Sequence, residues 1–134
     1  MIETALGTSI AFTAPHRLAS KAGYDILEAG GTAVEAMVAA AAQIAVVYPH
    51  MNSIGGDGFW LIKKTDQSPV AISACGPAAQ QATPEWYEKK SYKSFLPTRG
   101  PLAALTVPGT IAGWKLALEL DNPKRAVPLN ELLS

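Results

Sequence analysis

Apolar residues recur at helical spacing in two neighbouring stretches near the start of the chain. Leu18, Ala22 and Ile26 share one face of a helix predicted over residues 15–29. Gly30 and Gly31 follow it as a stop signal. A second helix is predicted from Thr32 to the residue before Pro49, because Thr32 and Glu35 have the spacing of a capping box. Its apolar face consists of Val34, Val38, Ala41, Ala45 and Tyr48.

Short apolar runs elsewhere predict strands. We expect a strand over residues 8–13, a hairpin formed by residues 59–63 and 70–74, and a further strand over residues 102–107. Thr83 and Pro84 predict the start of a short helix, and residues 89–101 turn basic and irregular, which indicates a loop. A helix is predicted from residue 108 to residue 120, stopped by Asp121-Asn122-Pro123. Residues 129–134 resemble the first turn of another helix, and the sequence shows no partner for its apolar face.

A glycine-rich bend separates the second helix from the hairpin. Gly55, Gly56 and Gly58 permit positive φ and leave no Cβ to hold another backbone away. We therefore expect Gly55 and Gly56 to tolerate no branched side chain. The bend lacks both the Gly-Lys-Ser/Thr ending of a phosphate-binding loop and a Gly-x-Gly-x-x-Gly frame. A tight structural turn and a substrate-facing loop, with Asp57 as the binding group, both remain open.

Composition narrows the classes of function. The chain has 134 residues, a formal net charge of zero and 49% hydrophobic residues, which suits one small globular unit with a core. The absence of any charge excess argues against nucleic acid as a partner. The longest apolar stretch contains Glu35 and Gln43 and is too short to cross a bilayer, so no membrane association is expected. The first residues show no secretory signal. A cytoplasmic location is therefore expected, or a periplasmic or secreted one for a chain whose signal has been removed.

An ordered series of short motifs identifies a family. The motifs are Ala14-Pro15-His16-Arg17-Leu18-Ala19-Ser20, Ala29-Gly30-Gly31-Thr32-Ala33-Val34-Glu35-Ala36, Val47-Tyr48-Pro49 with the glycine bend, Thr106-Val107-Pro108-Gly109-Thr110 and Ala112-Gly113-Trp114. From about Gly7 to its end, the chain resembles the N-terminal part of the large subunit of the γ-glutamyltranspeptidase family. Members of this family are autoprocessed N-terminal-nucleophile hydrolases.

This resemblance implies an α+β fold, the four-layer αββα sandwich, of which residues 1–134 form one N-terminal segment with no internal domain boundary. It implies a threonine nucleophile at the new N-terminus of a small subunit, which attacks an amide carbonyl and forms an acyl-enzyme. No such residue or cleavage site is evident here, so we expect no catalytic residue in the chain and no activity of these residues alone. The expected partners are the rest of the large subunit, the small subunit and a small-molecule amide. Assembly into a homo-oligomer is left open.

The resemblance also assigns a role to position 75. In γ-glutamyl-specific members, an Asp-x-Arg-Glu-x-Ala-Pro stretch supplies an arginine that binds the substrate α-carboxylate. Here the stretch reads Ser73-Ala74-Cys75-Gly76-Pro77-Ala78-Ala79, so the arginine position falls on Cys75. Gly76 and the residues 99–105 resemble the amidohydrolase-like branch, which acts on oxamate or acylated side chains. A true γ-glutamyltranspeptidase or glutathione hydrolase with Arg99 as the replacement carboxylate ligand, and a non-catalytic truncated fragment, are the alternatives.

For the other candidate residues, the sequence favours structural roles over catalysis, metal binding or nucleic-acid binding. Cys75 as a nucleophile would need a histidine partner, and we expect a buried small hydrophobic residue instead. His16 at a helix start and His50 after a helix end have no ligands at metal spacing, so no metal and no cofactor are expected. Thr110 is interpreted as a helix start whose hydroxyl satisfies a backbone amide. The basic and aromatic residues around Trp86 indicate a surface helix rather than a nucleic-acid site, because Glu85 and Glu88 lie among them.

Overall fold

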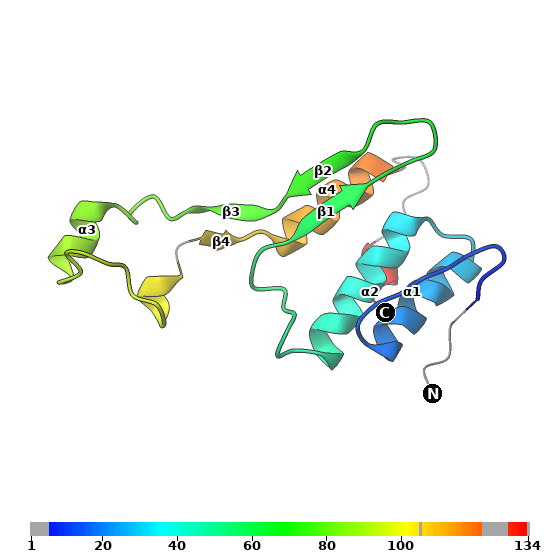
Figure 1. The fold of residues 1–134 in the computed structure, drawn as a ribbon, viewed down its shortest axis with the longest axis horizontal. Coiled ribbons are helices and arrows are strands. Elements are labelled where there is room, and N and C mark those ends of the chain that lie inside the picture. The colour runs from blue at the N-terminus through cyan, green and yellow to red at the C-terminus, as the bar shows by residue number, and fades with distance from the viewer. Residues whose placement is uncertain (1–5, 105, 122–128, 134) are drawn as a thin grey trace.

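Three longer helices and a β-hairpin form the body of the protein, and a narrow arm extends from it (Figure 1). The computed structural model describes residues 6–104, 106–121 and 129–133. The elements in chain order are α1 (Arg17–Glu28), α2 (Ala33–Val47), β1 (Phe59–Ile62), β2 (Val70–Ser73), β3 (Cys75–Ala78), α3 (Pro84–Lys89), the 3-10 helix η1 (Pro101–Ala103), β4 (Thr106–Pro108), α4 (Thr110–Asp121) and α5 (Leu129–Leu132).

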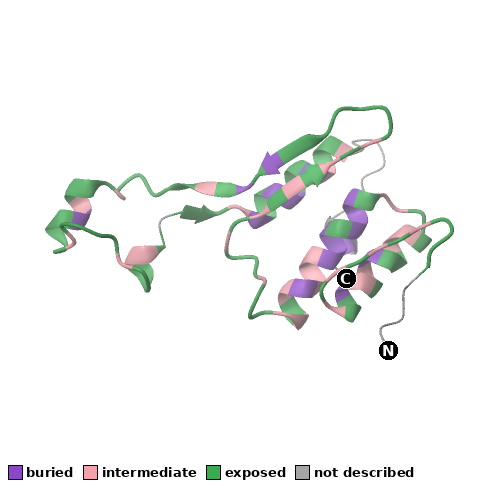
Figure 2. Cartoon of the chain, viewed as in Figure 1, coloured by how far each residue is buried: buried purple, intermediate pink, exposed green. Residues whose placement is uncertain are grey.

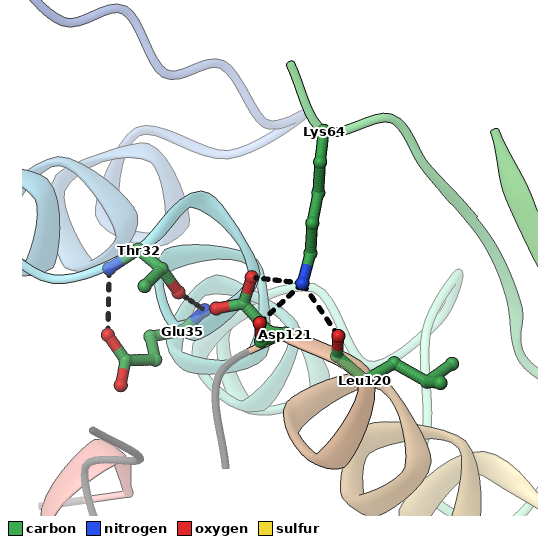
Figure 3. Close-up of polar contacts among 5 residues, drawn as sticks. All are labelled: Thr32, Glu35, Lys64, Leu120 and Asp121. Carbon is green, nitrogen blue, oxygen red and sulfur yellow. Dashed lines mark hydrogen bonds and ion pairs between the residues drawn. The ribbon is translucent and has the colours of Figure 1, made fainter. Parts of the chain in front are cut away.

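The two predicted N-terminal helices are confirmed, together with the glycine stop after α1 and the capping box that begins α2. Gly30 follows α1 with φ of 85°, in the left-handed region that favours glycine. The Thr32 side chain accepts a hydrogen bond from the Glu35 backbone N–H at 3.1 Å, and the Thr32 N–H donates to Glu35 Oε2 at 2.7 Å (Figure 3). This capping box satisfies two backbone donors at the start of α2. The buried side of α1 is formed by Ala19 and Gly23, whereas Leu18 is 44% exposed, so the predicted α1 face is displaced by one position.

Two strand pairs lie end to end. β1 and β2 form the predicted antiparallel hairpin, with Phe59 opposite Ser73 and Ile62 opposite Val70. The pairing of β3 with β4, across the arm, was not predicted. Helices α2 and α4 contact each other, and α4 contacts both strands of the hairpin. Trp60 and Ile62 point from β1 toward the helices, while Phe59 and Leu61 are exposed.

The core lies between the helices and one face of the hairpin. One cluster contains Val34, Ile72, Ala74 and Ala117, and a second contains Val38, Trp114 and Leu132. The buried positions gather along α2, α4 and the end of β2, while most of the arm is exposed (Figure 2). Leu132 of α5 is 5% exposed, so the expectation that this helix has no partner is wrong. Its partners, Val38 and Trp114, lie far away in sequence.

Helix α4 is bound at its C-terminal end by the hairpin. The Lys64 ammonium donates to the Leu120 carbonyl at 2.6 Å and to the Asp121 carbonyl, and it lies 3.6 Å from the Asp121 carboxylate (Figure 3). A cation at this end complements the helix dipole and satisfies carbonyls that have no partner within the helix. The helix is described through Asp121, one residue beyond the predicted last residue, Leu120. Asn122 and Pro123, the rest of the predicted stop signal, lie outside the described residues.

Two predicted strands differ from the structure. Residues 8–13 form no strand; the Phe12 ring instead packs so closely on Gly23 that a Cβ there would clash with it. The predicted strand over residues 102–107 is shortened to β4, because Pro101–Ala103 form η1 and the Tyr87 hydroxyl donates to the Leu102 carbonyl at 2.9 Å. Residue 105 lies outside the described residues. Among the described helices, none is long and apolar enough to span a membrane.

Candidate substrate-binding site

The glycine bend is hydrogen-bonded to the start of α4. The Gly56 carbonyl accepts hydrogen bonds from the backbone N–H groups of Gly109 and Thr110, both at 3.1 Å. It also accepts one from the Thr110 hydroxyl, at 2.7 Å. Thr110 is 7% exposed and is the first residue of α4. Its position at a helix start is confirmed, but the hydroxyl donates to a carbonyl rather than accepting from an amide.

The expectation that the glycines of the bend adopt positive φ is wrong. Gly30 and Gly100 are the glycines with positive φ among the described residues, and neither lies in the bend. A Cβ on Gly55 would approach only the Ser53 hydroxyl, at 3.7 Å, and a Cβ on Gly56 would meet nothing within 4 Å. Within this segment, the steric constraint therefore does not fall on Gly55 or Gly56.

The closest backbone approaches lie where β3 meets β4 and α4. A Cβ on Gly76 would clash with the Val107 carbonyl, and a Cβ on Gly109 would clash with the Ala74 carbonyl. A Cβ on Gly113 would lie 2.7 Å from the Ala74 Cβ. The sequence pattern does not reveal these three contacts, because each glycine contacts a residue that is distant in sequence.

A backbone pair brings two of the candidate residues to the same end of the hairpin. The Ala74 N–H donates to the Gly58 carbonyl at 2.8 Å, and the Gly58 N–H donates to the Ala74 carbonyl at 3.4 Å. Asp57 and Cys75 each lie one residue beyond this pair. Asp57 is exposed, and among the described residues its carboxylate has no hydrogen bond to its own backbone. It borders a cavity of about 620 Å³ between α2 and β1.

Cys75 is exposed at the start of β3, so the expected burial of this thiol is wrong. It pairs with Pro108, and it borders a shallow cavity of about 220 Å³. No described residue that lines this cavity carries a charged side chain; the others are Ile72, Ser73, Ala74, Gly76, Gly109, Ala112, Gly113 and Leu116. The cavity beside the position that corresponds to the arginine of γ-glutamyl-specific members therefore has no cation among its described lining residues.

Arg99, the third candidate residue, does not lie at the end of the hairpin where Asp57 and Cys75 lie. It is exposed, between α3 and η1, and this segment lies at the end of the arm, beyond the β3–β4 pair (Figure 1). At the start of α3, hydrogen bonds from the backbone N–H of Glu85 and from the Thr83 side chain lower the pKa of the Glu85 carboxyl. The Lys90 ammonium lies 5.7 Å from the Trp86 ring centre. These contacts within the arm fit the predicted surface helix.

The histidines have structural contacts. His16 Nδ1 accepts a hydrogen bond from the Leu18 N–H at 3.2 Å and caps α1. The His50 ring lies edge-on to the Tyr48 ring, with centres 4.2 Å apart. Within the described residues, no three His, Cys, Asp or Glu side chains form a group suited to a metal ion.

Comparison with known proteins identifies the family. The family model for γ-glutamyltranspeptidase matches residues 19–126. The chain belongs to the γ-glutamyltranspeptidase family. It is 54% identical over 123 residues to the oxamate amidohydrolase proenzyme of Klebsiella pneumoniae, covering 90% of this chain and 23% of that protein. It is 40% identical over 120 residues to a glutathione hydrolase-like proenzyme of Bacillus subtilis, covering 89% of this chain and 22% of that one.

Solved structures agree with this assignment. The γ-glutamyltranspeptidase of Helicobacter pylori superposes with a TM-score of 0.76 at 30% identity, over 97% of this chain and 37% of that one. The cephalosporin acylase of Bacillus halodurans superposes with a TM-score of 0.71 at 35% identity, over 77% of this chain and 19% of that one. The chain spans between a fifth and a quarter of the length of the two curated relatives. The fold is therefore a segment of the N-terminal-nucleophile αββα sandwich, as predicted.

Proposed function

We propose that this chain is part of an autoprocessed N-terminal-threonine amidohydrolase that acts on a small amide. The observation that carries the proposal is the 54% identity to an oxamate amidohydrolase proenzyme. The lack of a cation among the described residues that line the cavity at Cys75 supports it, because arginine binds a carboxylate strongly through paired hydrogen bonds and the γ-glutamyl-specific members have an arginine at this position.

The proposed reaction uses a threonine outside residues 1–134. Its hydroxyl attacks the amide carbonyl, the freed α-amine takes the hydroxyl proton, and the proton passes to the departing amine or ammonia. Water then hydrolyses the acyl-threonine ester and regenerates the hydroxyl. Transfer of the acyl group to an amine in place of water would make the same enzyme an acyltransferase. The described segment would contribute the scaffold and part of the acyl-binding surface, with the rest of the large subunit and the small subunit as partners.

A second candidate is a true γ-glutamyl-transferring or glutathione-hydrolysing enzyme. Its support is the 35% identity over 123 residues to the glutathione hydrolase proenzyme of Escherichia coli. This function requires a carboxylate ligand to replace the arginine at position 75. Arg99 could take that role only if the complete protein brings the end of the arm to the acyl site.

The test uses the complete polypeptide, whose maturation into two subunits is followed by mass spectrometry. We expect ammonia release from oxamate at a kcat/KM at least tenfold above that for glutamine, and weak turnover of γ-glutamyl-p-nitroanilide. A preference for the γ-glutamyl donor would favour the second candidate. A polypeptide that neither matures nor turns over any of these substrates would favour the non-catalytic alternative. Residues 1–134 alone should release no ammonia. Fractionation of the native host would test the proposed cytoplasmic location.

A further inference from the structure

The register of the hairpin brings the carboxylate of the glycine bend to position 75. Gly58 and Ala74 exchange both backbone hydrogen bonds, as directly opposed residues of an antiparallel pair do. Asp57 precedes Gly58 and Cys75 follows Ala74, so the same register, continued by one residue, sets Asp57 across from Cys75. In an antiparallel ladder, the residues beside such a hydrogen-bonded pair are those whose side chains approach most closely.

A second connection holds Asp57 in this place from its other side. The Gly56 carbonyl accepts a hydrogen bond from the Gly109 N–H at 3.1 Å. Gly109 directly follows Pro108, which pairs with Cys75. Both neighbours of Asp57 are thus bonded to segments that adjoin Cys75. Paired strands lie about 5 Å apart, so the carboxylate is within the roughly 10 Å over which charges interact at 0.1 M salt.

Asp57 gives this end of the hairpin an uncompensated negative charge. Its side chain is exposed, and it takes part in no ion pair among the described residues. Lys63 is the other charged residue among those described as lining the adjoining cavity of about 620 Å³. The Lys63 ammonium donates to the Lys64 carbonyl at 2.7 Å, at the other end of β1, about 20 Å away for an extended segment.

We propose that Asp57 is a specificity-determining residue, and that Asp57 and Cys75 form a subsite that selects the far end of the acyl group by its charge. This inference rests on the proposed amidohydrolase function and deepens it. An acyl group that ends in an ammonium gains a charge-assisted hydrogen bond to the carboxylate, whereas one that ends in a carboxylate is repelled. The carboxylate of oxamate is bonded directly to the reacting carbonyl carbon, so its binding depends on groups beside the nucleophile and not on this subsite.

Asp66 provides a matched control. It is an exposed aspartate in the turn between β1 and β2, at the other end of the same hairpin. Asp66→Asn removes one negative charge, as Asp57→Asn does, and asparagine tolerates the φ of 58° at this position. If only the overall charge of the hairpin matters, the two variants should behave alike.

The first measurement uses the Cys75 thiol as a probe of the local charge. The matured full-length enzyme is treated with cationic and anionic methanethiosulfonates, and mass spectrometry of the peptide that contains Cys75 gives the two labelling rates. Asp57→Asn should lower the cation-to-anion ratio of these rates at least about threefold, whereas Asp66→Asn and the charge-conserving Asp57→Glu should leave it nearly unchanged. An unchanged ratio in Asp57→Asn overturns the proposal. A thiol that neither reagent modifies also overturns it, because a substrate could not reach position 75 either.

The second measurement follows ammonia release from three amides that differ only in the group at the end of the acyl chain. These are 5-aminopentanamide, pentanamide and glutaramate, which end in an ammonium, a methyl group and a carboxylate. Wild type should prefer them in that order, and Asp57→Asn should lower the ratio of kcat/KM for 5-aminopentanamide to that for glutaramate at least about fivefold. Asp66→Asn should leave the ratio unchanged.

The outcomes separate the two proposals. A matured wild type that hydrolyses oxamate, but turns over none of the three longer amides or shows no preference among them, overturns the role of Asp57 and leaves the amidohydrolase proposal standing. Failure of the matured wild type to hydrolyse oxamate counts against the proposed function itself, while the labelling rates still decide whether Asp57 acts on position 75. Should Asp57→Asn fail to mature, Asp57→Ser supplies the same loss of charge.

Discussion

Two carbonyl groups, those of Ala74 and Val107, leave no room for side chains at Gly109 and Gly76. In a close-packed interior, an added methyl group has to displace its neighbours, and backbone atoms move less readily than side-chain ends. The bend glycines Gly55 and Gly56 are in open space by comparison. The steric importance of a glycine here follows from what faces it, and not from its place in a glycine-rich run.

Gly109→Ala and Gly76→Ala should each destabilise the complete protein by about 1–3 kcal/mol, the usual cost of overpacking, or prevent maturation. Gly56→Ala is the control, because a Cβ there meets nothing within 4 Å in this segment. Thermal unfolding and the fraction of matured enzyme are the measurements. Equal losses for Gly56→Ala and Gly109→Ala would mean that the glycine bend is covered by parts of the protein beyond this segment.

The Thr110 hydroxyl gives a second prediction at the residue scale. Thr110→Val removes the hydrogen bond to the Gly56 carbonyl but keeps the shape of the side chain, so it should cost about 1 kcal/mol of stability. Thr110→Ser, which keeps the hydroxyl, should retain most of the stability that Thr110→Val loses. Because the hydroxyl contacts a carbonyl and not an activating base, both matured variants should keep amide turnover within a few fold of wild type. Loss of turnover by Thr110→Val in a normally matured enzyme would instead assign Thr110 a catalytic role.

Elements whose determinants are local in sequence could be predicted. The capping box of α2 needs only Thr32 and Glu35, three residues apart, and the hairpin needs only two apolar runs and a short connection. The pairing of β3 with β4 joins segments about 30 residues apart, and Pro77 and Gly76 in β3 disfavour a strand prediction. The same limit applies to the candidate site. Position 75 could be singled out from its sequence motif, but the exposure of Cys75 and its pairing with Pro108 depend on contacts with residues distant in sequence.

Helix α4 is held at both ends by the segment that contains β1. The Gly56 carbonyl accepts from its first N–H groups, and Lys64 donates to its last carbonyls. Both contacts match the helix dipole, with an acceptor at the positive end and a cation at the negative end. This arrangement fixes the position of α4 along β1, and hence of Gly109 against Ala74.

Lys64→Met should therefore weaken the last turn of α4 before it affects the rest of the body. The lysine side chain is partly buried, so a loss of about 1 kcal/mol is expected. Hydrogen exchange of the amides near Asp121 should accelerate, while that near Thr110 stays unchanged. Lys115→Met is the control on the same helix, because its ion pair with Glu119 is exposed and exposed pairs contribute little. Equal exchange in the two variants would show that Lys64 does not hold the helix end.

At the scale of the molecule, the helices cover one face of the hairpin and leave the other face open. In an αββα sandwich, two sheets pack face to face, so the side chains on the open face acquire partners only in the complete protein. Phe59 and Leu61 are exposed here, as is Phe95 on the arm, at 73%. Each described strand also pairs with only one neighbour, which leaves an unpaired edge on every strand.

These surfaces predict that residues 1–134, prepared alone, self-associate. Exposed apolar side chains next to unpaired strand edges promote association, because pairing buries both. Light scattering should show species larger than a monomer, and Leu61→Ser should shift the distribution toward monomer, since it places a polar group on the open face. Lys115→Ser, on the exposed side of α4, should not. A monodisperse monomer with a sharp thermal transition would show that the segment is self-sufficient and that its open face needs no partner.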